Sequence, residues 1–436
     1  MKLVRPRMHP CQVSALLVLI FVLGGCTDNA ATASIRPTSS HSARTDSSTT
    51  SSDGTSGLGA WVISAVHSTG GRQGELVSVS CPAVADCYAA GFSFLGDGLS
   101  YPPVSPGLNE RPVVEHFNGA RWSMMPLPST PGILNRVTCV TPQDCIAVGG
   151  TELNYQTNGT SLVESFNGHR WSVVPSPNLG AAAFAGTPAA GAPPGQIQNV
   201  LEDVACRGVA ECFAVGDASV VLNGDSIVVE PITVRFDGTS WAATTLTTAL
   251  AEFSDIACDS EVCLAVGSSS NDLRTEVPIA ATLSGTTWMQ TAAPVGEFAI
   301  RGVTCAATTC RVLTYSRSVG VYSGGSWTAQ NLPTVPAQMT TWYGLTCFRA
   351  TQCVAVGQDN SAEGRTALNP LAWDKTLVAI LSNGRWSIES SPNGADMNNA
   401  LLGVACPAWH KCVTVGYSQV PSGLNAGLVS PLALTP

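Results

Sequence analysis

The most regular feature of the chain is a pair of short apolar runs that flank two closely spaced cysteines. In each of seven copies, a Val, Ile or Leu stands two residues before the first cysteine, and an apolar run follows the second cysteine. In six copies this second run ends in glycine, at Gly91, Gly149, Gly216, Gly267, Gly357 and Gly416. Only the fifth copy differs, with Thr314 in that place. Short apolar runs bounded by turn residues are typical of β-strands. We therefore predict one strand that ends at the first cysteine and another that begins at the second.

A second motif lies between the cysteine pairs and predicts a hairpin. Residues 117–122 read Phe-Asn-Gly-Ala-Arg-Trp, residues 166–171 read Phe-Asn-Gly-His-Arg-Trp, and residues 236–241 read Phe-Asp-Gly-Thr-Ser-Trp. Weaker copies end at Trp288, Trp327 and Trp386. Asn-Gly and Asp-Gly between apolar runs favour a tight hairpin turn, because both residues tolerate positive φ. A third strand therefore runs into each turn, and a fourth begins near the tryptophan.

Each unit thus predicts four short strands, which is the content of one blade of a β-propeller. The seventh copy shows three of them, over Leu401–Cys406, Cys412–Gly416 and Leu428–Leu434. A candidate for its fourth strand lies near the other end of the chain, at Ala60–Ser64. Such a strand would close the ring and remove its edges. We predict an all-β fold over residues 60–436, a seven-bladed β-propeller of four-stranded antiparallel blades closed by an N-terminal strand.

The N-terminal segment predicts export and lipid attachment. A positively charged start, with Lys2, precedes the apolar run Val13–Leu23, which is short for a membrane span of about 20 residues. The run ends in Leu-Gly-Gly-Cys at 23–26, which resembles the lipobox of bacterial lipoproteins. The resemblance implies cleavage of a signal peptide, residues 1–25, and a diacylglycerol on Cys26. An ordinary signal peptide cleaved nearby is the alternative. Residues 26–59 are rich in Ser and Thr and are expected to form a flexible tether.

Cysteine usage fits an exported protein. Of sixteen cysteines, setting aside Cys11 and Cys26 leaves fourteen, and these form seven close pairs: Cys81/Cys87, Cys139/Cys145, Cys206/Cys212, Cys258/Cys263, Cys305/Cys310, Cys347/Cys353 and Cys406/Cys412. The short gap suits a bond across the first hairpin, so we predict one disulfide within each blade. A zinc site needs four converging ligands. Pairs spaced one per blade lie too far apart to share an ion, so neither a metal nor a cofactor is expected.

Composition narrows the classes of partner. The chain is 44% hydrophobic and only 12% charged, with a formal net charge of −9. An acidic chain without a basic stripe is a poor candidate for nucleic-acid binding. No second apolar span follows the N-terminal one. We therefore expect the protein to sit on the extracytoplasmic face of the cell membrane, held by the lipid on Cys26.

The Asn/Asp-Gly-x-x-Trp turns resemble the Asp-box of sialidase-like (BNR) repeat propellers. The match is degenerate, and Asp237 is the one clear acidic copy. The resemblance covers residues 60–436 and implies a propeller scaffold. In that family the Asp-boxes lie opposite the active site, so the turns themselves imply no catalysis. The paired-cysteine copies also resemble repeat lipoproteins of high-GC Gram-positive bacteria.

A binding site is expected at the mouth of the propeller, beside the start of the inner strands. Three long insertions fall there: Phe92–Arg111, Asn178–Gln198 and Gln358–Lys375. The residues three and four before the first cysteines approach this mouth and are the candidate ligand-binding residues: Arg136, Glu202, Asp203, Asp255, Arg301 and Tyr343. Such a set suits a polar or sugar-like ligand, and two carboxylates suit acid–base hydrolysis. Alternatively, these charges line the channel and pair with one another.

No coherent catalytic set is visible. The four histidines of the repeat region lie in different blades: His67, His116, His169 and His410. Neither a serine nucleophile elbow nor a zinc-protease helix motif is present. We therefore predict a non-catalytic, membrane-tethered module that binds a protein or glycan of the cell envelope. A sialidase-like hydrolase acting at the mouth is one alternative, and an assembly factor for envelope complexes is another.

Overall fold

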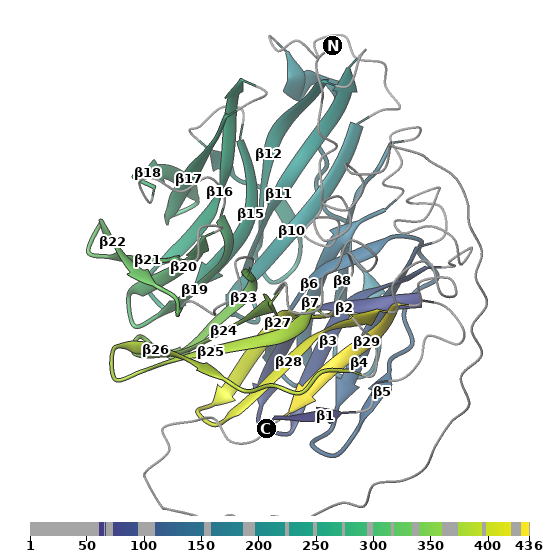
Figure 1. The fold of residues 1–436 in the computed structure, drawn as a ribbon. Helices are drawn as coiled ribbons and strands as arrows, with labels where there is room; N and C mark the ends of the chain where they lie inside the picture. Colours follow the sequence, from purple (N-terminus) through teal and green to yellow (C-terminus); the bar gives the residue numbers. More distant parts are fainter. Residues whose placement is uncertain are drawn as a thin grey trace, which may run out of the picture.

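β-Strands make up almost all of the structure (Figure 1). The computed structural model describes residues 61–64, 66, 73–94, 110–151, 158–185, 197–222, 226–246, 251–272, 275–293, 300–314, 318–333, 340–359, 374–394, 398–419 and 429–435. Within these ranges, the one helical segment is a 3₁₀ turn at Ala181–Phe184.

The first twelve strands after β1 build three sheets in chain order. Sheet 1 contains β2 (Gln73–Ala83), β3 (Asp86–Phe94), β4 (Arg111–Phe117) and β5 (Trp122–Met124). Sheet 2 contains β6 (Ile133–Thr141), β7 (Asp144–Gly150), β8 (Ser161–Phe166) and β9 (Trp171–Val173). Sheet 3 contains β10 (Ile197–Gly208), β11 (Glu211–Leu222), β12 (Ser226–Phe236) and β13 (Trp241–Ala243).

The remaining strands build four more sheets. Sheet 4 contains β15 (Ala251–Cys258), β16 (Cys263–Asp272), β17 (Thr275–Ser284), β18 (Thr287–Thr291) and the short β14 (Thr245–Leu246). Sheet 5 contains β19 (Ile300–Ala306), β20 (Thr309–Thr314), β21 (Ser318–Ser323) and β22 (Ser326–Asn331). Sheet 6 contains β23 (Thr340–Arg349), β24 (Gln352–Asp359), β25 (Lys375–Ser382) and β26 (Arg385–Glu389). Sheet 7 contains β27 (Asn398–Ala408), β28 (Lys411–Gln419), β29 (Val429–Thr435) and β1 (Val62–Ser64).

The prediction of seven four-stranded antiparallel blades is wrong. Six sheets have that form, not seven, because β14 adds a fifth strand to sheet 4 and pairs with β18 in the parallel direction. β14 follows β13 after the single residue Thr244, so the chain leaves the outer edge of sheet 3 and continues along the outer edge of sheet 4. A two-residue strand carries no periodicity, so the sequence pattern gave no signal for it.

The first strand of each sheet is its inner strand, and the inner strands form a closed ring. β2 packs against both β27 and β6, and the series continues through β10, β15, β19 and β23 back to β27. Sheets arranged around a common axis in this way define a β-propeller. Its ends meet in sheet 7, where β1 pairs antiparallel with β29 and places Ile63 opposite Leu434.

Each of the seven sheets contains one disulfide, which joins its first strand to its second strand. The disulfides connect Cys81–Cys87, Cys139–Cys145, Cys206–Cys212, Cys258–Cys263, Cys305–Cys310, Cys347–Cys353 and Cys406–Cys412. These are the pairs that the cysteine spacing predicts. Each bond closes the hairpin at the end of the inner strand.

Every inner strand carries a β-bulge at the same point, four residues before its first cysteine. The register shifts lie between Leu76/Ser78, Leu134/Arg136, Leu201/Asp203, Phe253/Asp255, Ile300/Gly302, Trp342/Gly344 and Leu401/Gly403. The repeated glycine of the second strand lies beside this bulge. A Cβ on Gly149 would lie 2.0 Å from the carbonyl oxygen of Ile133, so no larger residue fits there without a backbone shift. The glycine therefore accompanies the bulge in six sheets, whereas sheet 5 forms the same bulge with Thr314 in that place. In every sheet the bulge positions the residues of the mouth.

Apolar side chains of neighbouring sheets interlock to form the core. Trp122 and Trp288, which open outer strands, have no exposed surface. Trp342 is 3% exposed and packs with Leu345 and Leu377 in a cluster that joins sheets 5 and 6. The core is thus a series of layers between sheets.

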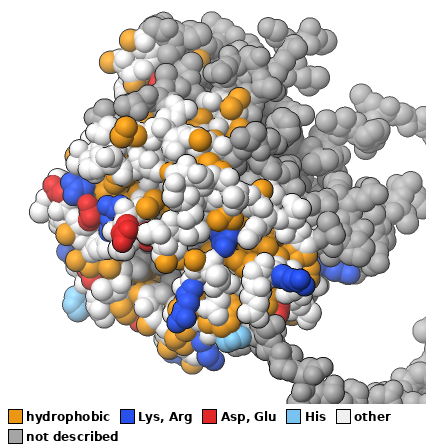
Figure 2. All heavy atoms as spheres, turned by 90° about the vertical axis from the view of Figure 1, so that its left-hand side faces the viewer, with side chains coloured by type: hydrophobic (Ala, Val, Ile, Leu, Met, Phe, Trp, Pro, Cys, Tyr) orange, Lys and Arg blue, Asp and Glu red, His pale blue; other side chains and the backbone are white. Residues whose placement is uncertain are grey.

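Figure 2 shows one face of the molecule, on which charged side chains of both signs occur with hydrophobic side chains scattered among them. A mixed face of this kind lacks the basic stripe that a nucleic acid requires. Across the described ranges, no helix has the length and apolar character that a membrane span would need.

Candidate functional site

The six residues predicted for the mouth lie at one level of the inner ring, because the bulges place them there. Three are the extra residues of bulges in β10, β19 and β23: Glu202, Arg301 and Tyr343. Three directly follow the bulges of β6, β10 and β15: Arg136, Asp203 and Asp255. The structure therefore distributes them over five neighbouring sheets, from sheet 2 to sheet 6.

Arg136, Asp203 and Asp255 meet in one ion-pair network. The Nε of Arg136 donates to Oδ1 of Asp203 at 2.6 Å, and its Nη2 donates to Oδ2 of the same carboxylate at 3.2 Å. Nη2 also donates to Oδ1 of Asp255. The carboxylates are buried, with 4% and 7% of their side chains exposed, whereas Arg136 keeps 30%. One guanidinium from sheet 2 thus joins carboxylates from sheets 3 and 4.

Asp203 also binds two backbone N–H groups. Its Oδ1 accepts a hydrogen bond from Val204 at 2.6 Å, and its Oδ2 accepts one from Ile256 of sheet 4 at 2.8 Å. Ser78 makes the corresponding contact in sheet 1, where its Oγ accepts a hydrogen bond from the N–H of Val137 in sheet 2 at 3.1 Å. Both Asp203 and Ser78 stand three residues before a first cysteine. This position therefore ties one inner strand to the next.

Burial sets the protonation of the two carboxyl groups. It raises the pKa of Asp255 to about 7; the charge of Arg136 opposes this rise, and the carboxylates of Asp203 and Glu202 add to it. Burial also raises the pKa of Asp203, against the lowering effect of Arg136 and of the two backbone N–H groups. The network holds two carboxyl groups and one guanidinium. A proton on Asp255 near neutral pH therefore balances its charge.

Glu202 and Tyr343 make separate polar contacts. The Oε2 of Glu202 accepts a hydrogen bond from Nδ2 of Asn135 at 3.2 Å. The hydroxyl of Tyr343 donates to Oε1 of Gln358 at 3.2 Å, and Nε2 of Gln358 donates to Oδ2 of Asp374 at 2.5 Å. Glu202 also acts on the Arg136 network through its charge, which adds to the rise in the pKa of Asp255.

Another part of the ring is apolar at the same level. The bulge residues Val77 and Leu402, together with Tyr343, pack in one cluster with Phe92, Phe94, Ile133, Ala400 and Tyr417. Close approach of the inner strands accompanies this packing, since a Cβ on Gly403 would lie 3.0 Å from Cα of Ser78. The mouth therefore combines a polar arc in sheets 2 to 4 with an apolar arc in sheets 6, 7 and 1.

The three long insertions lie largely outside the described residues. The described parts of Phe92–Arg111, Asn178–Gln198 and Gln358–Lys375 are residues 92–94 and 110–111, residues 178–185 and 197–198, and residues 358–359 and 374–375. Their predicted contribution to the mouth stays a prediction.

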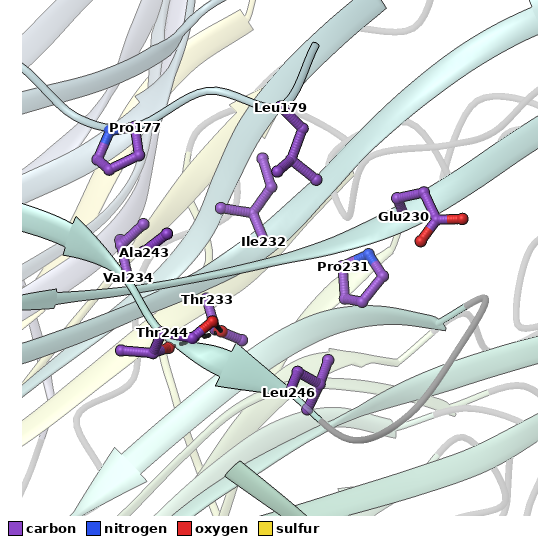
Figure 3. A pocket seen from close by; sticks show the side chains of 10 residues that line it. All are labelled: Pro177, Leu179, Glu230, Pro231, Ile232, Thr233, Val234, Ala243, Thr244 and Leu246. Atoms are coloured by element: carbon purple, nitrogen blue, oxygen red, sulfur yellow. Dashed lines mark hydrogen bonds between the residues drawn. The ribbon is translucent and has the colours of Figure 1, made fainter. Parts of the chain in front are cut away.

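Sequence reasoning missed a cavity on the outer side of the ring, at the edge of sheet 3. The cavity has a volume of about 230 Å³ and is lined by Pro177, Leu179, Glu230, Pro231, Ile232, Thr233, Val234, Ala243, Thr244 and Leu246. Figure 3 shows Leu179 and Ile232 on one side of strand β12 and Leu246 on the other, with Glu230 at one end. We call this feature the outer groove. Its walls come from sheet 3, from the segment after β9 and from β14.

The outer groove exists because the chain after β13 takes an unusual course. In sheet 2, Oδ1 of Asn178, after β9, accepts a hydrogen bond from the N–H of Ser161 on β8 at 2.7 Å. In sheet 6, Asn393 does the same for the N–H of Thr376 at 2.8 Å. The matching position on β12, by its pairing with the second strand, is Pro231. Here the chain has already left to form β14, so the edge is not covered by that segment.

One sequence signal marks sheet 3 as different. In five sheets a proline stands six residues after the tryptophan that opens the outer strand: Pro128, Pro177, Pro294, Pro333 and Pro392. Sheet 3 has Thr247 at this position, and sheet 7 has His67. The missing proline was the available sign that the chain after β13 follows another path.

Glu230 is the charged residue of the outer groove. Its side chain is half-buried, and burial raises its pKa. Among the described residues it forms neither an ion pair nor a hydrogen bond. A carboxylate held beside apolar side chains and a proline carbonyl gains stability from any cation that reaches it. No cluster of metal-ligating side chains occurs within the described part of the chain.

The closed ring of sheets identifies the chain as a β-propeller protein. Solved structures with a related fold include YCF48 bound to a D1 peptide, with a TM-score of 0.46, 12% identity, and coverage of 86% of this chain and 97% of that one. The WD40 β-propeller domain of Doa1 gives a TM-score of 0.47 at 10% identity, with the same coverage of 86% and 97%. No protein-family model matches the sequence, and no curated protein matches it.

Proposed function

We propose that this protein is a lipid-anchored β-propeller that binds a protein partner on the extracytoplasmic face of the cell membrane, without catalysis at its mouth. The observation that carries the proposal is the Arg136 network. Asp203 and Asp255 are the carboxylates that the sequence suggested for acid–base catalysis. Both are buried and bound to one guanidinium. They stabilise the ring and leave its surfaces for recognition.

The geometry argues against the hydrolase alternative. Glycoside hydrolysis needs one carboxyl group to protonate the leaving group and another to act as nucleophile or base, both in contact with the sugar. The two carboxylate oxygens of Asp203 accept hydrogen bonds from Arg136 and from the backbone N–H groups of Val204 and Ile256. Bringing a sugar to these oxygens would break an inter-sheet tie and leave a buried charge unpaired, which costs about 3–5 kcal/mol.

Support for a protein partner comes from the shape of the outer surface. The outer groove is a recess of mixed polar and apolar lining beside an open strand edge, and strand edges are where extended peptides commonly dock on folded domains.

Anchoring is tested by changing the lipidated residue. We expect wild-type protein to fractionate with membranes and to incorporate a labelled fatty acid, and Cys26→Ala to lose the label. A Cys11→Ala variant is the matched control and should keep both properties. Equal labelling of Cys26→Ala and wild type would contradict the lipid anchor.

Binding is tested by site-specific photo-crosslinking of the full chain in its native cells. A photoreactive phenylalanine analogue would replace Glu202 at the mouth, the exposed Ala242 beside the outer groove, or the exposed Val209 at the turn between β10 and β11. We expect one discrete protein adduct from the mouth or groove position and none from Val209. No adduct at either position, together with sugar release from envelope polysaccharide that Asp255→Asn abolishes, would replace this proposal with the hydrolase.

A further inference from the structure

We infer that the outer groove binds an extended segment of the partner protein, with an aliphatic side chain in the cavity and a Lys or Arg side chain against Glu230. This inference rests on the proposed function and adds to it the place of binding and the chemistry of the bound segment. It is argued from the open edge of β12, the lining of the cavity, and the charge at its end.

The outer edge of β12 is unpaired over half of its length. β13 pairs with it only over Val234–Phe236, and the carbonyl of Thr233 accepts one more hydrogen bond, from the N–H of Thr244 at 2.9 Å. Backbone groups along a strand alternate in direction, so Pro231 and Val229 face the same side as Thr233. Within the described ranges, no strand pairs with them there.

Pro231 decides which groups this edge offers. Proline has no N–H, so at this position the edge presents a carbonyl acceptor and no donor. A proline on an edge strand also prevents a second sheet from adding continuously. A second copy of the chain pairing edge to edge is therefore disfavoured. A suitable occupant is rich in hydrogen-bond donors and touches the edge over a short stretch.

The cavity selects a side chain rather than a whole small molecule. Its volume of about 230 Å³ lies below the roughly 300–1,000 Å³ of pockets that enclose small-molecule ligands. Leu179, Ile232 and Leu246 supply its aliphatic walls. An aliphatic side chain that enters it is stabilised by removal of its surface from water.

Glu230 provides the charge complementarity that chooses among peptides. It lies at one end of the cavity, next to Pro231 along the strand (Figure 3). Its carboxylate and the Pro231 carbonyl are both acceptors, and a Lys or Arg side chain supplies several donors with a positive charge. The net charge of −9 further favours encounter with basic segments.

The test uses the immobilised full chain and a display library of linear peptides of about twelve residues. We expect the enriched peptides to carry Lys or Arg close to Leu, Ile or Val. Their affinity should fall roughly 3- to 10-fold in Glu230→Gln and further in Glu230→Lys. Glu261→Lys, an exposed charge change at the opposite end of the strands, is the control and should have no effect.

Variants at two adjacent alanines test whether filling the groove blocks binding without any change in charge. Ala243 lines the cavity and Ala242 does not, although both lie exposed on β13. We expect Ala243→Trp to abolish binding of the selected peptides and Ala242→Trp to leave it unchanged, with equal melting temperatures. Enriched peptides without basic residues, or equal binding to both variants, would overturn the inference.

The crosslinking experiment distinguishes failure of the proposed function from failure of the inference about the outer groove. An adduct that forms from the mouth position and persists in Ala243→Trp would leave the proposed function standing and refute the role of the groove. An adduct from the Ala242 position that both Glu230→Lys and Ala243→Trp lose would support both.

Discussion

At the scale of single residues, the position three before the first cysteine joins neighbouring sheets where it holds a polar side chain, but it holds Gly302, Gly344 and Gly403 in sheets 5, 6 and 7. In sheet 1 it holds Ser78, in sheet 3 Asp203, and each of these side chains accepts a backbone N–H from the next inner strand. The sequence identified these positions because each lies at a constant distance from the first cysteine along its inner strand. It left open whether the charges bind a ligand or one another, since that depends on how three separate sheets close into a ring.

The protonation of Asp255 predicts a particular dependence of stability on pH. Its pKa rises from 3.8 to about 7 on folding, so the folded state binds more protons than the unfolded state between these values. The free energy of unfolding should therefore fall as pH increases from about 4 to 7, by up to a few kcal/mol. Asp255→Asn should flatten this fall, as measured by urea denaturation at a series of pH values. Glu261→Gln, in an exposed turn, is the control and should leave the slope as in wild type.

Removal of the single cation in this network should have a larger effect. Arg136→Leu leaves two buried carboxyl groups without a cation, and we expect a loss of about 3–5 kcal/mol at neutral pH. Because protonation relieves the unpaired charges, the variant should recover part of its stability near pH 5. A loss of the same size at both pH values would show that packing of the Arg136 stem, and not charge, carries the effect.

At the scale of elements, most of each sheet was predictable and its outer edge was not. The cysteine pairs and the Asn/Asp-Gly-x-x-Trp turns fix four strands, because strand period and turn chemistry are local. β14 escaped prediction because two residues in a parallel pair depend on a neighbour in another sheet. The outer groove follows from that strand and so escaped as well. Its edge was still marked by Pro231, whose equivalents in sheets 1, 4 and 7 are Pro112, Pro278 and Pro431.

The element with the greatest effect per residue is β1. It has three residues, and the adjacent Trp61 is 6% exposed in the core between sheets 6 and 7. We expect Trp61→Ala to destabilise the protein by about 3–5 kcal/mol, as for other buried tryptophans. Val62→Thr, on the exposed side of the same strand, is the control and should change stability by less than about 0.5 kcal/mol. Equal effects in thermal unfolding would mean that β1 contributes pairing but no anchoring side chain.

At the scale of the whole molecule, the disulfides and the β-bulges both repeat once per sheet around the ring. Every sheet has its own disulfide, and every inner strand has its own bulge. The repeat was legible in the sequence because cysteine spacing survives where other residues vary. The sequence showed that charged residues lie near the mouth. It did not show which of them pair, because the paired residues come from different copies of the repeat.

The disulfides should each contribute a modest and similar amount of stability. A loop of five or six residues gives about 2 kcal/mol by loss of entropy in the unfolded chain. We expect the double variant Cys258→Ser/Cys263→Ser to lose about this much. Thiol titration of the oxidised, denatured chain should detect none of the fourteen cysteines. Titration of several thiols, or cross-links between different sheets in peptide mapping, would contradict the pairing.

The pairing of β1 with β29 has a consequence for the order in which the protein matures. Residues 62–64 and 433–435 are almost the full length of the domain apart in sequence, so their contact is the least local in the fold. Such contacts form late, because a long loop must close first. If the chain is exported and lipid-anchored as proposed above, β1 lies nearest the membrane and must wait until β29 has crossed. Lipid attachment would then precede closure, and the ring would be sealed last next to its tether.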